Sequence, residues 1–120
     1  MSEFYFAARR TAEKIHPALN VYAYGHVGDG NWHMSMGPGE GLDDATFDSL
    51  HDVTIRTLDE LIWEFGGTIS AEHGIGVENR LRVVGQKPAV EREYMAGLKR
   101  LFDPKGVFNP GKLIDVAPTA

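Results

Sequence analysis

The sequence predicts an α+β domain in which an antiparallel sheet has helices packed on one of its faces. Two alternating segments rich in Val, Tyr and Trp, 20–27 and 31–36, flank the turn signal Asp29-Gly30 and predict a β-hairpin. Residues 43–65 carry apolar side chains three or four positions apart, which is the spacing of one helix face. Because helices precede and follow an antiparallel hairpin, we expect them to form a separate layer over the sheet.

The first half of the chain should contain two helices, one on each side of the hairpin. The segment 3–19 reads as a helix that ends near His16, because the proline that follows disfavours helical geometry before it. Asp43 or Asp44 can cap the start of the long helix, and a glycine pair ends it. The apolar stripe of this helix consists of Phe47, Leu50, Thr54, Leu58, Leu61 and Phe65.

The second half of the chain should be a glycine-rich loop followed by helices and turns. Residues 66–76 include four glycines and predict a loop with a short strand at Thr68 to Ser70. A helix is expected over part of Val77 to Val84. Another should open at Pro88, a favoured first helical position, and run to about Phe102. The segment 103–114 reads as a series of turns.

The composition is that of an ordinary globular domain and limits the chemistry open to the chain. The 120 residues are 42% hydrophobic and 24% charged, which suits one domain with a modest core. The net charge of -5 argues against a nucleic-acid partner, which would require a basic face. The sequence has no cysteine, so disulfides and thiol catalysis are excluded, and any bound metal must use histidine and carboxylate ligands.

The sequence gives no sign of a membrane span or a secretory signal. No apolar run approaches the ~18 residues that a membrane-spanning helix needs. The N-terminal segment 1–10 lacks a long apolar stretch followed by a cleavage site. We therefore expect a cytoplasmic location.

The hairpin is the first candidate site because it brings two histidines together. A two-residue loop at Asp29-Gly30 sets His26 directly opposite His33, on the same face as Tyr24 and Ser35. Two opposed imidazoles can bind one divalent ion, at about 2.0–2.1 Å for zinc. They can equally be neutral histidines on a polar strand face, because two ligands do not complete a metal site. The core face would carry Val21, Ala23, Val27, Trp32, Met34 and Met36.

Two loop motifs are the other candidates. Glu72 and His73 are adjacent in the glycine-rich loop and could be an ordinary surface pair. Two histidines and one carboxylate form a recognised catalytic metal set, however, which His26, His33 and Glu72 would supply, with His73 as a nearby proton acceptor. The third motif, Asn-Pro-Gly-Lys from Asn109, reads from its turn chemistry as a chain-end turn that packs Phe108.

Three motifs in this order carry a family resemblance. They are GHVGDGNWH, GGTISAEHGIG and LKRLFDPKGVFNPGKLI, and together they span about Asn20 to Ile114. The sequence resembles the C-terminal region of FAD-linked oxidases of the vanillyl-alcohol oxidase type. The nearest branch looks like the D-2-hydroxyacid dehydrogenases, with D-lactate dehydrogenase, the glycolate oxidase flavin subunit and D-2-hydroxyglutarate dehydrogenase.

The resemblance implies a role for each candidate residue. His26, His33 and Glu72 match residues that hold a divalent metal, expected to be zinc or manganese. His73 matches the active-site base, and Asn109 matches an asparagine near the flavin. The fold implied is a cap domain of ferredoxin-like type.

Two departures from the family pattern concern the substrate. Ser35 stands where the family often has an asparagine that touches the substrate, and Asn79 stands where a lysine is common. These differences leave the reaction class unchanged and the identity of the hydroxyacid open.

The resemblance also implies that residues 1–120 are the C-terminal cap or substrate domain of a longer enzyme. The family's FAD-binding domain lies N-terminal and is far longer than the few residues before Asn20. We therefore expect the isolated chain to be inactive. A two-stranded hairpin is marginal by itself, so we also expect it to join a larger sheet or a second copy in a homodimer.

The activity implied is oxidation of a small 2-hydroxyacid to a 2-oxoacid. A metal ion would assist deprotonation of the hydroxyl group, and hydride would pass to FAD. Peripheral membrane association of the longer protein is compatible with this activity. Two other classes remain open, a metal-dependent hydrolase that uses the same ligands to activate water and a non-catalytic metal-binding or assembly module.

Overall fold

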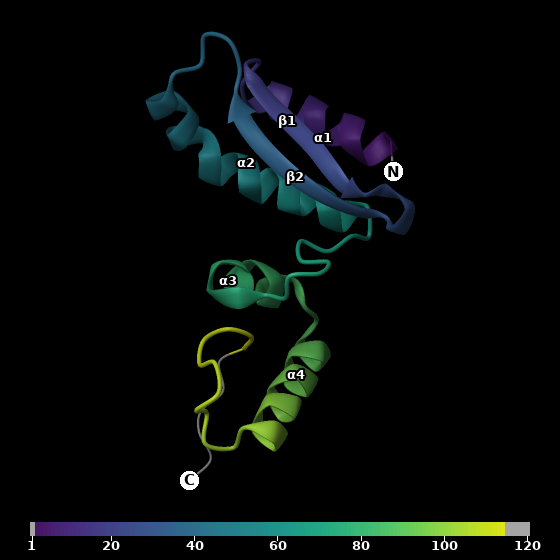
Figure 1. Cartoon of the computed structure of the whole chain (residues 1–120), viewed down its shortest axis with the longest axis vertical. Helices are drawn as coiled ribbons and strands as arrows, with labels where there is room; N and C mark the ends of the chain where they lie inside the picture. The colour runs from purple at the N-terminus through teal and green to yellow at the C-terminus, as the bar shows by residue number, and fades with distance from the viewer. Residues whose placement is uncertain (1, 115–120) are drawn as a thin grey trace. The chain divides into compact units, whose positions relative to one another are not determined.

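The computed structural model describes residues 2–114, and within them it contains four α-helices and one two-stranded antiparallel sheet (Figure 1). The chain divides into two units, Met1–Gly67 and Thr68–Ala120. In the described range, no helix is both long enough and apolar enough to cross a membrane. The α+β fold class predicted from the sequence is confirmed.

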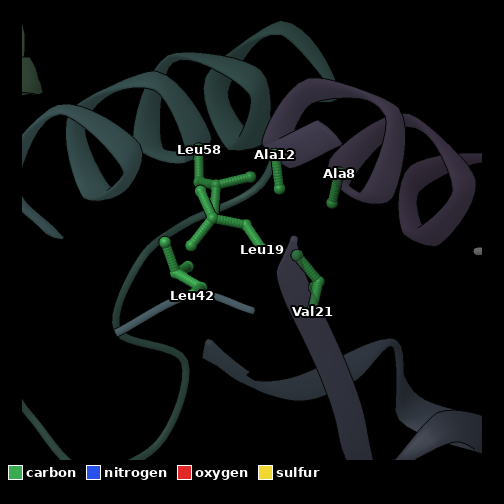
Figure 2. Packing of buried hydrophobic residues seen from close by; sticks show 6 residues of the cluster. All are labelled: Ala8, Ala12, Leu19, Val21, Leu42 and Leu58. Atoms are coloured by element: carbon green, nitrogen blue, oxygen red, sulfur yellow. The ribbon is translucent and has the colours of Figure 1, made fainter. Parts of the chain in front are cut away.

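In the first unit, two helices pack on one face of a β-hairpin. The helices are α1 (Ser2–Ile15) and α2 (Asp44–Glu64), and the strands are β1 (Leu19–His26) and β2 (Asn31–Pro38). Figure 2 shows the buried cluster between them, and each leucine or valine buried there contributes about 1.5–3 kcal/mol. Its members are Ala8, Ala12, Leu19, Val21, Leu42 and Leu58.

Helix α2 begins as the sequence predicts, and most of its predicted stripe faces the core: Thr54 and Leu58 are buried and Phe47, Leu50 and Leu61 are partly buried, whereas Phe65, at the C-cap, is exposed. The N-cap is Asp43, whose carboxylate accepts hydrogen bonds from the N–H of Thr46 at 2.9 Å and from its hydroxyl at 2.7 Å. These bonds hold the pKa of Asp43 below its ordinary value. Thr54 is fully buried, and its hydroxyl donates to the carbonyl of Leu50 at 2.8 Å, so the buried group is satisfied.

The hairpin register differs from the prediction by two residues. His26 pairs with Asn31 and His33 pairs with Tyr24, so the prediction that the histidines are directly opposed is wrong. The reason is the loop: Val27–Asp29 form a short 3-10 turn, and Gly30 closes it in the left-handed region at φ 76°. Four residues rather than two therefore separate the strands.

Despite the shifted register, most strand side chains lie on the predicted face of the hairpin. The reason is that side chains alternate with a period of two, so a shift of two residues does not change their face. Val21, Met34 and Met36 lie on the core side, whereas Tyr24 and His26 are exposed. Val27 was expected in the strand and on the core face. It lies in the 3-10 turn instead and is exposed. Strand β2 also runs through Gly37 and Pro38, two residues beyond the predicted segment 31–36.

The second unit contains a loop, two helices and a C-terminal series of turns. Helix α3 spans Gly76–Gln86 and helix α4 spans Ala89–Phe102, close to the predicted limits. The short strand expected at residues 68–70 is absent from this described segment. The N–H of Ser70 instead bonds the hydroxyl of Thr68 at 3.4 Å, a local alternative to strand pairing.

Candidate functional site

The exposed face of the hairpin gathers the two histidines with two tyrosines. His33 stacks on Tyr24, with ring centroids 5.4 Å apart and an interplanar angle of 11°. On the same face the ring of His26 is 6.2 Å from that of His33, at an angle of 57°. His26 and His33 are thus diagonal neighbours across the strands, a separation that long side chains bridge. The face can therefore present two imidazoles to one ion.

Gly25 makes room for the ring of His33. Its φ is 131°, a conformation that residues with a Cβ rarely adopt. A Cβ at this position would lie 2.8 Å from the carbonyl oxygen of Asn31 and 2.8 Å from Cδ2 of His33. A side chain at position 25 would therefore displace either the strand backbone or the imidazole.

In the second unit, Glu72 and His73 contact each other on the glycine-rich loop. Nε2 of His73 lies 3.1 Å from Oε1 of Glu72. The side chain of His73 is 80% exposed and that of Glu72 36%, so this contact is a surface contact and adds little stability. The hydroxyl of Ser70 donates to the carbonyl of Gly74 and closes the loop around the pair. Helix α3 begins after this loop, with Ile75 as its N-cap and no side-chain hydrogen bond to the cap.

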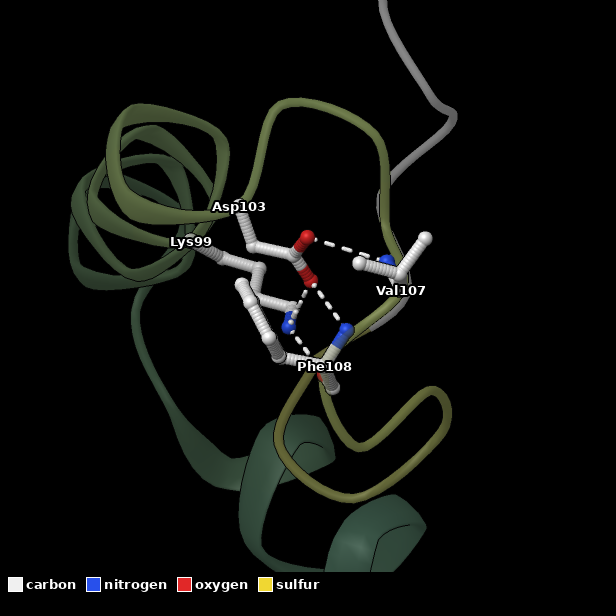
Figure 3. Close-up of polar contacts among 4 residues, drawn as sticks. All are labelled: Lys99, Asp103, Val107 and Phe108. Atoms are coloured by element: carbon white, nitrogen blue, oxygen red, sulfur yellow. Dashed lines mark hydrogen bonds and ion pairs between the residues drawn. The ribbon is translucent and has the colours of Figure 1, made fainter.

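Asn109 lies on an exposed turn whose backbone is held by a buried carboxylate. Asn109 has φ 46°, a left-handed conformation that asparagine tolerates better than most residues. Six residues earlier, Asp103 is 4% exposed and accepts hydrogen bonds from the backbone N–H groups of Val107 and Phe108 (Figure 3). The segment forms a turn as predicted, but Phe108 is 65% exposed, so the expectation that the turn packs Phe108 is wrong.

Sequence reasoning did not identify Asp103 or its partner Lys99. Nζ of Lys99 lies 2.6 Å from Oδ2 of Asp103. This hydrogen bond is the main reason that the pKa of Asp103 is lowered, and the bonds from the backbone add to it. The i,i+4 spacing of a lysine and an aspartate at the end of α4 was the available signal.

The two residues that depart from the family pattern have different surroundings. Ser35 is exposed on β2 and pairs with Tyr22, on the same face as His33. Asn79, on α3, accepts a hydrogen bond from Nη1 of Arg82 at 2.9 Å. Ser35 therefore offers a hydroxyl beside the histidines, whereas the amide oxygen of Asn79 is already bonded to a neighbouring cation.

The predicted site residues thus fall into three local groups. His26, His33 and Ser35 share the exposed face of the hairpin in the first unit. Glu72 and His73 are in contact on the loop of the second unit. Asn109 lies further along in the second unit, on the turn tied to Asp103.

Comparison with known proteins places the chain in one family. Residues 1–113 match the family model described as FAD linked oxidases, C-terminal domain. The chain therefore belongs to this family of C-terminal domains from FAD-linked oxidases, as the motifs indicated.

The relatives include enzymes named for 2-hydroxyacid oxidation. The chain is 34% identical to a D-2-hydroxyglutarate dehydrogenase of Stutzerimonas stutzeri, over 82% of this chain and 21% of the relative. It is 33% identical to the enzyme of the same name from Xanthomonas citri pv. viticola, over 99% of this chain and 26% of the relative. A D-lactate dehydrogenase of Archaeoglobus fulgidus is 33% identical, over 95% of this chain and 24% of the relative. The chain spans about a quarter or less of the length of these curated relatives.

Proposed function

We propose that this chain is the C-terminal part of an FAD-dependent dehydrogenase that oxidises a D-2-hydroxyacid to a 2-oxoacid. The observation that carries the proposal is the neighbouring pair His26 and His33 on an exposed face, in a chain that matches the C-terminal domain of FAD-linked oxidases. The names of the relatives support the substrate class. An FAD-binding domain outside residues 1–120 would hold most of the flavin.

We infer that His26, His33 and Glu72 would hold a divalent metal ion. The donor set fits, because two imidazoles and one carboxylate suit zinc and also other first-row metals such as manganese. Both histidines are on one face of the hairpin with ring centroids 6.2 Å apart, and the Glu72 carboxylate is partly exposed. When bound, the ion would supply Lewis acidity that lowers the pKa of the substrate hydroxyl.

His73 would act as the general base. Its imidazole is 80% exposed and therefore accessible to a substrate. The Glu72 carboxylate, 3.1 Å from Nε2, restricts the orientation of the ring. His73 would take the proton of the substrate hydroxyl, and a positioned base of this kind contributes about 10²–10⁴-fold to the rate.

Ser35 and Asn109 would contact the substrate and the flavin, respectively. Ser35 places a hydroxyl on the same face as His33, where it can bond a polar group of the hydroxyacid. Asn109 would turn its amide toward the flavin, whose role is to accept hydride from the carbon that carries the hydroxyl. The remaining contacts to the substrate carboxylate would come from outside this chain.

A flavin-reduction experiment tests this proposal. D-2-Hydroxyglutarate or D-lactate is added without oxygen to the complete flavoprotein, and the flavin absorbance is recorded. We expect one of these acids to bleach the flavin, and His73→Ala to slow bleaching by about 10²-fold or more. His51→Ala is the matched control, because His51 is an exposed histidine on α2 that also contacts a carboxylate, 3.2 Å away on Asp52.

The outcomes separate the three function classes. Metal-dependent hydrolysis without any flavin would support the hydrolase. Bound metal and flavin with no bleaching by any 2-hydroxyacid would support the non-catalytic module. The cytoplasmic location stays a prediction, which cell fractionation can test.

A further inference from the structure

The turn that carries Asn109 is ordered by a polar network rather than by apolar packing. Oδ1 of Asp103 accepts from the N–H of Val107 at 2.9 Å, and Oδ2 accepts from the N–H of Phe108 at 2.9 Å. Nζ of Lys99 donates both to Oδ2 of Asp103 and to the carbonyl of Phe108. Figure 3 shows Lys99, Asp103 and Phe108 joined to one another by these hydrogen bonds and the ion pair, with Val107 bonded to the other oxygen of Asp103.

The burial of the side chains indicates that the carboxylate of Asp103 is the group that orders the turn. Asp103 is 4% exposed, whereas the side chains beside it on the turn, those of Val107 and Phe108, are 64% and 65% exposed. Apolar contacts of those two residues therefore cannot hold the turn within this unit. A buried carboxylate with several donors is, by contrast, a strong local anchor.

The network acts on Asn109 through the backbone. The N–H and the carbonyl of Phe108 belong to the two peptide planes that flank its Cα. Asp103 holds the first plane, and Lys99, itself paired with Asp103, holds the second, which leads into Asn109. On the other side, the carbonyl of Asn109 accepts from the N–H of Lys112 at 3.3 Å. Between these anchors Asn109 has its left-handed φ of 46°. A change at Asp103 would release the first anchor.

We propose that Asp103 is a positioning residue that, with Lys99, holds the Asn109 side chain in the orientation used toward the flavin. This inference rests on the proposed function, because it assumes that Asn109 contacts FAD. Asp103 itself is buried in the network and has no contact with the cofactor in this role.

A double-mutant cycle on flavin affinity tests the proposal in the complete flavoprotein. Asp103→Asn keeps the shape of the side chain and replaces one acceptor oxygen by an NH₂ group. We expect Asp103→Asn and Asn109→Ala each to weaken FAD binding by about 10-fold, the usual effect of one lost hydrogen bond. Because Asp103 acts through Asn109, the double variant should bind FAD no more weakly than Asn109→Ala. Additive losses would overturn the proposal.

A matched control exists on the same helix. Glu91 also forms an i,i+4 ion pair with a lysine, Lys87, at 3.0 Å, but the pair is exposed. Glu91→Gln should therefore leave FAD affinity within about twofold of the unmodified protein, as expected for surface pairs.

Amide hydrogen exchange distinguishes a released turn from an unfolded unit. In Asp103→Asn we expect faster exchange at Val107 and Phe108 and unchanged exchange at Val83, which is buried in α3. Faster exchange at Val83 as well would mean that Asp103→Asn unfolds the unit. Lys99→Gln then takes its place in the double-mutant cycle with Asn109→Ala, and we again expect non-additive losses of FAD affinity. Faster exchange at the two turn amides with unchanged FAD affinity would overturn the proposal. The proposed function is tested separately by flavin bleaching.

Discussion

At the scale of single residues, Gly25 determines whether His33 can occupy its observed position. Gly25→Ala would place a Cβ 2.8 Å from the His33 ring, at a φ of 131°. We expect the variant to lower the free energy of unfolding of the first unit by about 1–3 kcal/mol, the usual cost of a residue held in a disfavoured conformation. Urea unfolding followed by circular dichroism measures it.

Gly28→Ala is the control for this substitution. Gly28 has no atom within 4 Å of its would-be Cβ and no left-handed φ. It should change the free energy of unfolding by less than about 0.5 kcal/mol, as exposed substitutions usually do. Equal effects of the two variants would contradict the role assigned to Gly25.

The pH dependence of stability follows from the cap residue Asp43. Its folded-state pKa is lowered because the backbone N–H of Thr46 donates to its carboxylate. The stability from this cap is therefore fully present above the unfolded pKa of about 3.9 and is lost as the pH falls through the lowered folded pKa. Asp43→Ala should be less stable than the unmodified chain at pH 7, and the difference should shrink below about pH 4. Thermal melts across that range test it, and a constant difference would contradict it.

The site residues could be predicted where a local pattern identifies them, and only there. The alternation of the strands placed His26 and His33 on one face, and the structure agrees. Direct opposition was wrong, because the turn chemistry of Asp29-Gly30 is compatible with more than one loop length. The role of Asp103 depends on a fold-back of the chain over five residues, which periodicity does not report.

At the scale of elements, helix α2 is the best-predicted part of the chain, and it contributes Leu58 to the buried cluster, with Phe47, Leu50 and Leu61 packed against it. Leu58→Ala removes a side chain that is 7% exposed in the buried cluster, so we expect a loss of about 2–4 kcal/mol in the free energy of unfolding. Leu81→Ala, at a position on α3 that is 77% exposed, should cost less than about 1 kcal/mol. Denaturant titration compares them, and equal losses would contradict the assigned core.

The glycine-rich loop was harder to predict than the helices. A strand at residues 68–70 was plausible from the β-branched Thr68 and Ile69, yet side-chain hydrogen bonds by Thr68 and Ser70 give the backbone a local alternative. Strand pairing needs a neighbouring strand, and a short segment cannot reveal whether one exists. Helices α3 and α4 were predictable because their hydrogen bonds are internal to each segment.

At the scale of the whole molecule, the proposed division of labour predicts that residues 1–120 alone neither hold FAD nor oxidise 2-hydroxyacids. Within the described second unit, large apolar side chains on α4, such as Leu98 and Leu101, are exposed. Without bound flavin, the purified chain should be colourless. The unpaired edges of its two-stranded sheet should also promote self-association, which sedimentation would detect. A yellow chain with a flavin absorbance band and turnover would refute this expectation.

We propose as the central claim that two strand histidines and one loop glutamate would form the metal site of a flavin-dependent 2-hydroxyacid dehydrogenase. The most direct test is metal analysis of the complete flavoprotein and its variants His26→Ala and Glu72→Ala, with flavin content measured on the same samples. Losing one of three protein ligands should reduce metal content by at least about tenfold and abolish most activity, while flavin content stays unchanged. Full metal occupancy in both variants would contradict the claim.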